Sequence, residues 1–257
     1  ADTMTGGTDH TRKAEPSDAS AQTEALNVRG RYARRDAAGD AERYSLSDPY
    51  ARAAWQERQI KVQALLAAAQ FADWSALDVL DVGCGAGRNM QDWLQLGVQP
   101  ERLQGIELLP ERAATARSVL PEACRIWNAD ALDPALQQSI APESQDLAVL
   151  FTVFSSILSS TVQQQLAQQV WRWVKPGGAV LWHDFIYNNP RNADVRGVTV
   201  KQLRALFPDA EMTVQRVTLA PPLGRIACRV SPALYPVLNS IPLLRTHVLC
   251  LLRKPPP

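Results

Sequence analysis

Short apolar runs alternate with stretches of helical spacing through the middle of the chain, and this alternation limits the possible folds more than any other feature. The runs are Leu77–Val82, Leu103–Leu108, Cys124–Trp127, Leu147–Phe151 and Ala179–Trp182. The stretches between them that show helical spacing include Asn89–Leu96, Pro110–Val119 and Val162–Val174. Strands joined through helices lie parallel with right-handed crossovers. The pattern therefore predicts a doubly wound α/β sheet.

The carboxyl-terminal third of the chain departs from this alternation. Thr199–Leu206 has the spacing of a helix, and Met212–Leu219 and Thr246–Arg253 are typical of two further strands. The residues between these strands, about 220–245, contain five prolines and several large apolar side chains. We therefore expect an inserted apolar helix, or a pair of helices, before the last strand.

The amino-terminal residues have a different composition. Residues 1–26 carry few large apolar side chains, so we predict a disordered tail there. Residues 27–75 are expected to form a helical cap, in which Ser47 or Asp48 caps a helix that has Pro49 in its first turn. The main domain would then cover residues 76–257.

Composition excludes several classes of protein. The chain has 257 residues, with 27 Lys and Arg against 26 Asp and Glu, and this balance argues against a dedicated nucleic-acid binder. Its apolar runs are far shorter than the roughly 20 residues of a transmembrane helix. The four cysteines, Cys84, Cys124, Cys228 and Cys250, show no paired spacing. We therefore expect no metal site, no disulfides and a cytoplasmic location.

A glycine-rich segment, Val79–Arg88, follows the first predicted strand and opens the next helix. Gly83, Gly85 and Gly87 allow a tight turn and the close approach of a ligand. Glu107, at the end of the second strand, is placed to accept hydrogen bonds from the two hydroxyls of a ribose. Together these features predict a nucleotide-cofactor site.

Asp81 indicates which nucleotide is bound. A dinucleotide site has the spacing G-x-G-x-x-G, whereas this loop has G-x-G-x-G and an acid two residues before Gly83. A carboxylate there would repel a diphosphate and favour an ammonium group. S-adenosylmethionine carries an ammonium, a sulfonium and no phosphate, so it fits better than a nicotinamide dinucleotide.

These residues resemble the class I S-adenosylmethionine-dependent methyltransferases, most strongly over about residues 75–185. The resemblance implies a seven-stranded Rossmann-like sheet whose last strand is antiparallel. It also implies that Asp130 contacts the adenine amino group, and the alternative is that Asp130 only caps the turn that follows. The cofactor-binding residues expected on this basis are Asp81, Gly83, Cys84, Gly85, Gly87, Glu107, Leu108, Asp130, Ala131 and Phe151. Of these, Cys84 is expected only as a small residue of the loop, and Phe151 is equally compatible with a core position.

A second polar cluster follows the fifth predicted strand and would face the acceptor. Asp184 and His183 are the candidate general bases, and strand alternation allows only one of them to face the crevice. Asp184, nearer the loop, is slightly preferred. The candidate acceptor-binding residues are Tyr187, Asn188, Asn189, Arg191 and Asn192. Such a mixture of amides with one aromatic ring suits a sugar better than a flat apolar ring.

Three later segments are similar to bacterial methyltransferases of cell-surface polysaccharide loci. They are Asn188–Arg196, Thr218–Leu223 and Pro242–His247. This similarity implies O-methylation of a saccharide, and the apolar insertion could then face a membrane or a partner. The alternatives are a methyltransferase for a small isoprenoid, aromatic or polyketide-like acceptor, and a non-catalytic cofactor-binding or scaffold protein. The oligomeric state stays open.

Overall fold

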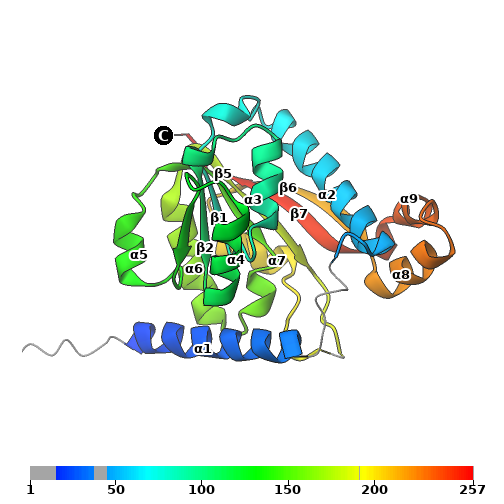
Figure 1. Cartoon of the computed structure of the whole chain (residues 1–257), viewed down its shortest axis with the longest axis horizontal. Helices are drawn as coiled ribbons and strands as arrows, with labels where there is room; N and C mark the ends of the chain where they lie inside the picture. Colours follow the sequence, from blue (N-terminus) through cyan, green and yellow to red (C-terminus); the bar gives the residue numbers. More distant parts are fainter. Residues whose placement is uncertain (1–15, 38–44, 191, 257) are drawn as a thin grey trace, which may run out of the picture.

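A seven-stranded sheet forms the centre of the protein in a computed structural model that describes residues 16–37, 45–190 and 192–256 (Figure 1). The strand order is β3-β2-β1-β4-β5-β7-β6, and only β7 runs antiparallel to its neighbours. The strands are β1 Val79–Val82, β2 Leu103–Glu107, β3 Arg125–Asn128, β4 Gln145–Phe151, β5 Val174–Phe185, β6 Glu211–Leu219 and β7 Arg245–Arg253. The predicted doubly wound sheet is confirmed.

Helices cover both faces of this sheet and define two apolar layers. One layer lies under α2 (Pro49–Ala68), α3 (Arg88–Gln95) and α4 (Pro110–Val119). The other lies under α5 (Pro134–Ser139), α6 (Ser160–Trp173) and α7 (Val200–Leu206). All four residues of β1 are buried because the strand is covered on both faces, which explains why three of them are apolar.

The amino-terminal prediction needs a correction. Helix α1 spans Pro16–Ala37, so ordered structure begins ahead of residue 27, and only residues 1–15 of the predicted tail lie outside the described residues. Figure 1 shows α1 lying across one end of the sheet. This is the carboxyl edge, since α1 contacts the segments that follow β4 and β5. Arg31 donates to the Ser156 carbonyl at 2.9 Å, and Arg34 pairs with Asp194 at 2.7 Å.

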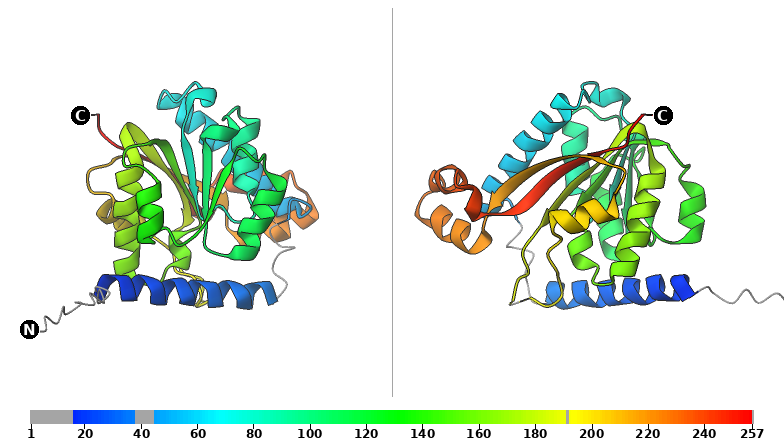
Figure 2. Two further views of the ribbon diagram at one scale, coloured as in Figure 1. Left: turned by 60° about the vertical axis from the view of Figure 1, so that its left-hand side comes forward. Right: turned by 180° about the vertical axis from the view of Figure 1, so that it is seen from behind.

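The predicted start of the second helix and the insertion are both found. Asp48 caps α2 by accepting from the Ala51 amide, with Pro49 in the first turn. Two helices, α8 (Pro221–Val230) and α9 (Leu234–Asn239), form a lobe between β6 and β7. Figure 2 shows this lobe projecting beyond the ends of these two strands.

Membrane-spanning helices, grouped metal ligands and disulfides are all absent from the described residues. None of their helices is long and apolar enough to cross a membrane. No three His, Cys, Asp or Glu side chains are grouped as metal ligands in these ranges. The four cysteines are all buried and unpaired.

Candidate active site

The loop after β1 takes a shape that only glycine accommodates readily. Gly83, Gly85 and Gly87 have φ values of 76°, 57° and 87°, in the left-handed region. A β-carbon on Gly83 would come within 2.8 Å of the Val153 side chain. A β-carbon on Gly85 would instead meet no atom within 4 Å. The loop therefore packs tightly at Gly83 and borders open space at Gly85.

Glu107, at the end of β2, holds this loop from the side. One of its carboxylate oxygens accepts from the Gly85 amide and the other from the Leu109 amide, both at 2.8 Å. Burial raises the pKa of Glu107, and these two hydrogen bonds oppose the rise. Each oxygen retains a second lone-pair direction, so the carboxylate can still accept from a ligand hydroxyl.

Asp81 is the most unusual acid of the site. It is buried in β1, and neither of its oxygens has a hydrogen-bond partner among the described residues. Burial, together with the nearby charge of Glu107, raises the pKa of Asp81 to about 7. An unpartnered buried carboxylate is costly, and a second acid beside it adds to the cost. The site therefore favours a cationic ligand.

Arg58, which the sequence reasoning missed, faces these acids from α2. Its guanidinium lies 5.0 Å from the centre of the Phe151 ring and donates to the Asn89 side chain at 3.1 Å. Burial lowers the pKa of Arg58 and the Asp92 carboxylate opposes this. Residues 58, 62, 65 and 66 share the inward face of α2. In the sequence, a charged residue at position 58 on this otherwise apolar helix face was the signal that could have identified Arg58 as a site residue.

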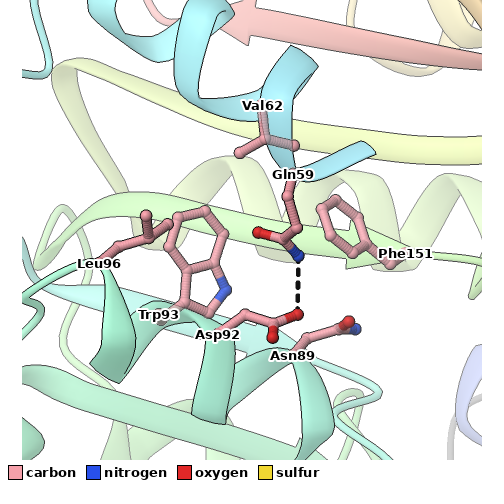
Figure 3. Close-up of a pocket in the computed structure, with 7 residues that line it drawn as sticks. All are labelled: Gln59, Val62, Asn89, Asp92, Trp93, Leu96 and Phe151. Atoms are coloured by element: carbon pink, nitrogen blue, oxygen red, sulfur yellow. Dashed lines mark hydrogen bonds between the residues drawn. The ribbon is translucent and has the colours of Figure 1, made fainter. Parts of the chain in front are cut away.

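A narrow cleft between α2 and α3 adjoins Arg58 (Figure 3). Gln59 reaches from α2 between the Trp93 and Phe151 rings and donates to Asp92 at 2.7 Å. The Trp55 indole donates to the same carboxylate at 3.0 Å. These bonds fix α2 over the start of α3, so Arg58 is held in a defined position above the sheet.

The segment after β3 carries the predicted adenine contacts. One oxygen of Asp130 accepts from the Leu132 amide at 2.9 Å, so this side chain does cap its own turn. Burial raises the pKa of Asp130. Leu108 and Ala131 are half-buried at the same sheet edge. Cys84 is buried, and its sulfur occupies the space that a β-carbon on Gly105 would take, as expected of a packing residue.

His183 and Asp184 lie on opposite faces of β5, as strand alternation predicts. Both oxygens of Asp184 accept from backbone amides, one from Ser155 at 3.0 Å and the other from Phe185 at 2.9 Å. Burial raises the pKa of Asp184 to about 6. Asp184 thus holds the short helix η4 (Phe154–Ser156) through the Ser155 amide.

His183 points to the α2 side, with Phe151. The two rings meet edge to face at 5.7 Å, and neither nitrogen of His183 has a hydrogen-bond partner in the described ranges. His247 of β7 stacks on it at 5.2 Å, a contact that the sequence reasoning missed. Burial and the neighbouring imidazole hold the pKa of His183 well below its usual value. The ring is therefore neutral near pH 7.

The predicted acceptor loop lies at the rim, and its amides are partly used within the loop. Asn188 accepts from the Gly197 amide and Asn192 from the Asp194 amide, both at 3.0 Å. Tyr187 is exposed and accepts from Arg216 at 2.9 Å. Asn189 is exposed beside them, and Arg191 lies outside the described residues.

Residues 79–178 match the family model described as a methyltransferase domain. The match covers less than half of the chain, and it makes this part of the protein similar to methyltransferase domains. A search of curated proteins gives no match. S-adenosylmethionine is the cofactor of this methyltransferase. Its cationic groups suit the unpartnered Asp81, and its bulk suits the open space at Gly85.

Solved structures share the fold of this methyltransferase at low sequence identity. A 1,6-didemethyltoxoflavin-N1-methyltransferase from Burkholderia thailandensis, with 1,6-didemethyltoxoflavin and S-adenosylhomocysteine bound, has a TM-score of 0.58 and 16% identity. The match covers 97% of this chain and 98% of that one. A possible histamine N-methyltransferase from Thermotoga maritima has a TM-score of 0.57 and 15% identity, covering 84% and 96%. The acceptors named for these two proteins differ, so the fold does not fix the acceptor.

Proposed function

We propose that this methyltransferase methylates a hydroxyl group of a saccharide and that His183 takes the hydroxyl proton. The observation that carries the proposal is the buried His183 imidazole, whose two nitrogens have no partner in the described part of the chain. A neutral imidazole beside the cofactor site can accept a proton from an attacking hydroxyl. A nitrogen nucleophile, in contrast, needs no such base when it arrives unprotonated.

The cofactor-binding roles that we propose follow the charges of the site. Asp81 would bind the ammonium group and Arg58 the carboxylate of the methionyl part. Glu107 would accept from the ribose hydroxyls, and Gly85 would border the bound molecule. At the other end, Asp130 and the Ala131 amide would face the adenine. In support, the acid without a partner and the guanidinium over Phe151 both lie beside the glycine loop.

The chemistry requires alignment and one proton transfer. When bound, S-adenosylmethionine supplies an activated methyl group on a positively charged sulfur. The acceptor oxygen would bond to the methyl carbon as the carbon–sulfur bond breaks, and the sulfur keeps that electron pair. The hydroxyl proton would pass to a nitrogen of His183. Phe151 and His247 pack against this ring and keep it in place.

A saccharide acceptor is supported by the polar rim. The loop after β5 presents Tyr187, Asn188, Asn189 and Asn192 beside the guanidinium of Arg216. Asn188 and Asn192 use their side-chain oxygens within the loop, so their side-chain N–H groups remain as donors. The hydroxyl oxygens of a polyol could accept hydrogen bonds from these donors. Arg191, also a proposed acceptor contact, belongs to the same loop.

A second candidate is a small planar or isoprenoid acceptor. It is favoured by the aromatic surface at the ends of β5 and β7, where Phe151, His183 and His247 are joined by Phe185 in edge-to-face contact. The methyltransferase from Burkholderia thailandensis that shares this fold acts, by its name, on N1 of 1,6-didemethyltoxoflavin. Aromatic surfaces also pack against sugar rings, so a transfer experiment must decide.

The experiment uses S-adenosylmethionine with a labelled methyl group and two acceptor pools, bacterial glycan extracts and small aromatic or isoprenoid alcohols. We expect label in an acid-stable methyl ether of a saccharide, and at least about a 100-fold lower rate for His183→Asn. Label only in the second pool would replace the saccharide with the rival acceptor. Cofactor binding by calorimetry without transfer to either pool would favour the non-catalytic alternative.

A further inference from the structure

The lobe formed by α8, α9 and the short helix η5 (Pro242–Leu244) exposes most of the large apolar side chains on the described surface. Six of the ten large hydrophobic residues that are exposed there belong to it: Ile226, Val230, Leu234, Val237, Ile241 and Leu243. The Leu243 side chain is 83% exposed and that of Val230 76%. Such a concentration is uncommon on a surface that faces only water.

These side chains point outward from a lobe whose inner side is firmly held. Glu57 of α2 accepts from the Thr218 amide at 3.0 Å, the Tyr235 hydroxyl at 2.7 Å and the Asn239 side chain at 2.8 Å. Tyr50 donates to the Leu219 carbonyl at 2.8 Å. Because the lobe has its own buried contacts, the exposed apolar face is part of a defined structure.

Helix α8 combines this apolar face with positive charge. Ile226 and Val230 lie one turn apart and are both exposed, and Arg229 beside Val230 is exposed as well, whereas Arg225 is half-buried over the Tyr50 ring. Moreover, the sequence from residue 212 to residue 257 contains no Asp or Glu. Arginines beside an exposed apolar stripe are typical of a helix that lies in the interface of an anionic membrane.

A second copy of the chain fits this face poorly. A two-fold contact would place the arginines of one α8 opposite those of the other, and the lobe sequence offers no acid to pair with them. Phospholipid headgroups would supply the missing negative charge, and acyl chains would cover the apolar tips.

The lobe also stands at the catalytic edge of the sheet. Strand β6 runs parallel to β5, because both are antiparallel to β7, so the lobe leaves the sheet at the carboxyl ends of the parallel strands. Arg245, at its root, is two residues from His247 and donates to the Arg216 carbonyl at 3.2 Å. Figure 2 shows the lobe as the outermost part of that end.

We propose that the α8–α9 lobe docks this protein on an anionic phospholipid bilayer, with Ile226, Val230, Val237 and Leu243 entering the interface and Arg229 facing the headgroups. Docking would hold the acceptor side of the sheet near the membrane surface. Membrane binding by the lobe does not depend on which acceptor is methylated. It can therefore be tested independently of the proposed function.

The test measures binding of the full chain to vesicles by co-sedimentation. The vesicles contain phosphatidylcholine alone or phosphatidylcholine with about one third phosphatidylglycerol. We expect binding to the anionic vesicles that weakens when salt is raised from about 0.1 M to 0.5 M, because the Debye length falls. Ile226→Asp with Val230→Asp should lower the partition coefficient at least about tenfold, and Arg229→Glu severalfold. Val119→Asp, at a residue of α4 that is also exposed, is the matched control and should bind like the wild type.

Folding of each variant is checked by its affinity for S-adenosylhomocysteine, which the lobe variants should retain. The proposal is overturned if the wild-type chain stays in the supernatant with anionic vesicles. It is equally overturned if folded Ile226→Asp/Val230→Asp protein binds as well as the control. Self-association that this double variant abolishes, without vesicle binding by the wild type, would assign the face to a second copy instead.

Discussion

Replacing Asp81 with asparagine should stabilise the ligand-free protein while it weakens the binding of the cofactor. The pKa of Asp81 rises from 3.8 to about 7, chiefly through burial. Between these two values the folded protein holds a proton that the unfolded chain has released, so the free energy of unfolding falls as pH rises through this window. About three pKa units correspond to a penalty of roughly 4 kcal/mol above pH 7.

Asparagine removes the charge but leaves a buried amide with unmet hydrogen bonds, which costs about 1–3 kcal/mol. We therefore expect Asp81→Asn to raise the free energy of unfolding by roughly 1–3 kcal/mol at pH 8. At pH 5 the advantage should shrink by roughly 2 kcal/mol, because the folded wild-type protein is then protonated. Affinity for S-adenosylhomocysteine, which keeps the ammonium group, should fall about 10- to 100-fold at pH 8.

Urea unfolding followed by circular dichroism at both pH values measures the stability, and calorimetric titration measures the affinity. Asp146→Asn is the matched control, because Asp146 pairs with Lys175 at 2.9 Å and accepts from the Asp78 amide at 2.8 Å. The control should lose stability at both pH values. An Asp81→Asn protein that is less stable than the wild type at pH 8, by an amount that does not change with pH, would refute the reasoning.

Three further substitutions test the site. Gly85→Val should abolish cofactor binding, as its side chain would fill the open space at a left-handed φ, and calorimetry that still detects binding would contradict the loop assignment. Arg58→Met should weaken S-adenosylhomocysteine about 10- to 100-fold if the guanidinium binds the carboxylate, whereas an unchanged affinity would remove it from the site. Asp184→Ala should lower the free energy of unfolding by about 1–3 kcal/mol, because the Ser155 and Phe185 amides lose their acceptor. If Asp184→Ala instead abolishes turnover in a fully stable protein, Asp184 is the base after all.

The sheet and the glycine loop could be predicted because their signals are local. Alternating apolar runs give the order of strands and helices, and the left-handed turn at Gly83 requires a residue without a β-carbon. The lobe was also visible, since prolines and apolar residues interrupt what would otherwise be a hairpin. These features depend on spacing along the chain, which a single sequence contains.

The missed features depend on pairing between distant segments. The charge of Arg58 lies near that of Asp81 only because α2 packs over the sheet, and His247 stacks on His183 only because β7 inserts beside β5. Alternation showed that His183 and Asp184 point in opposite directions without showing which direction faces α2. Helix α1 was missed for a similar reason: its buried pair, Arg31 with Glu24 at 2.6 Å, is held by backbone groups of residues 156 and 158.

The contacts of α1 join segments of the protein that are far apart in the sequence. A helix of 22 residues is about 33 Å long. This helix contacts the segment after β4 through Arg31 and the segment after β5 through Arg34. Arg112 of α4 stacks on Tyr32, next to Arg31, with its guanidinium carbon 4.5 Å from the centre of the ring. Because Arg31, Tyr32 and Arg34 lie within one turn of α1, the segments after β4 and β5 and helix α4 are joined at one place, and a displacement of this turn would break all three contacts together.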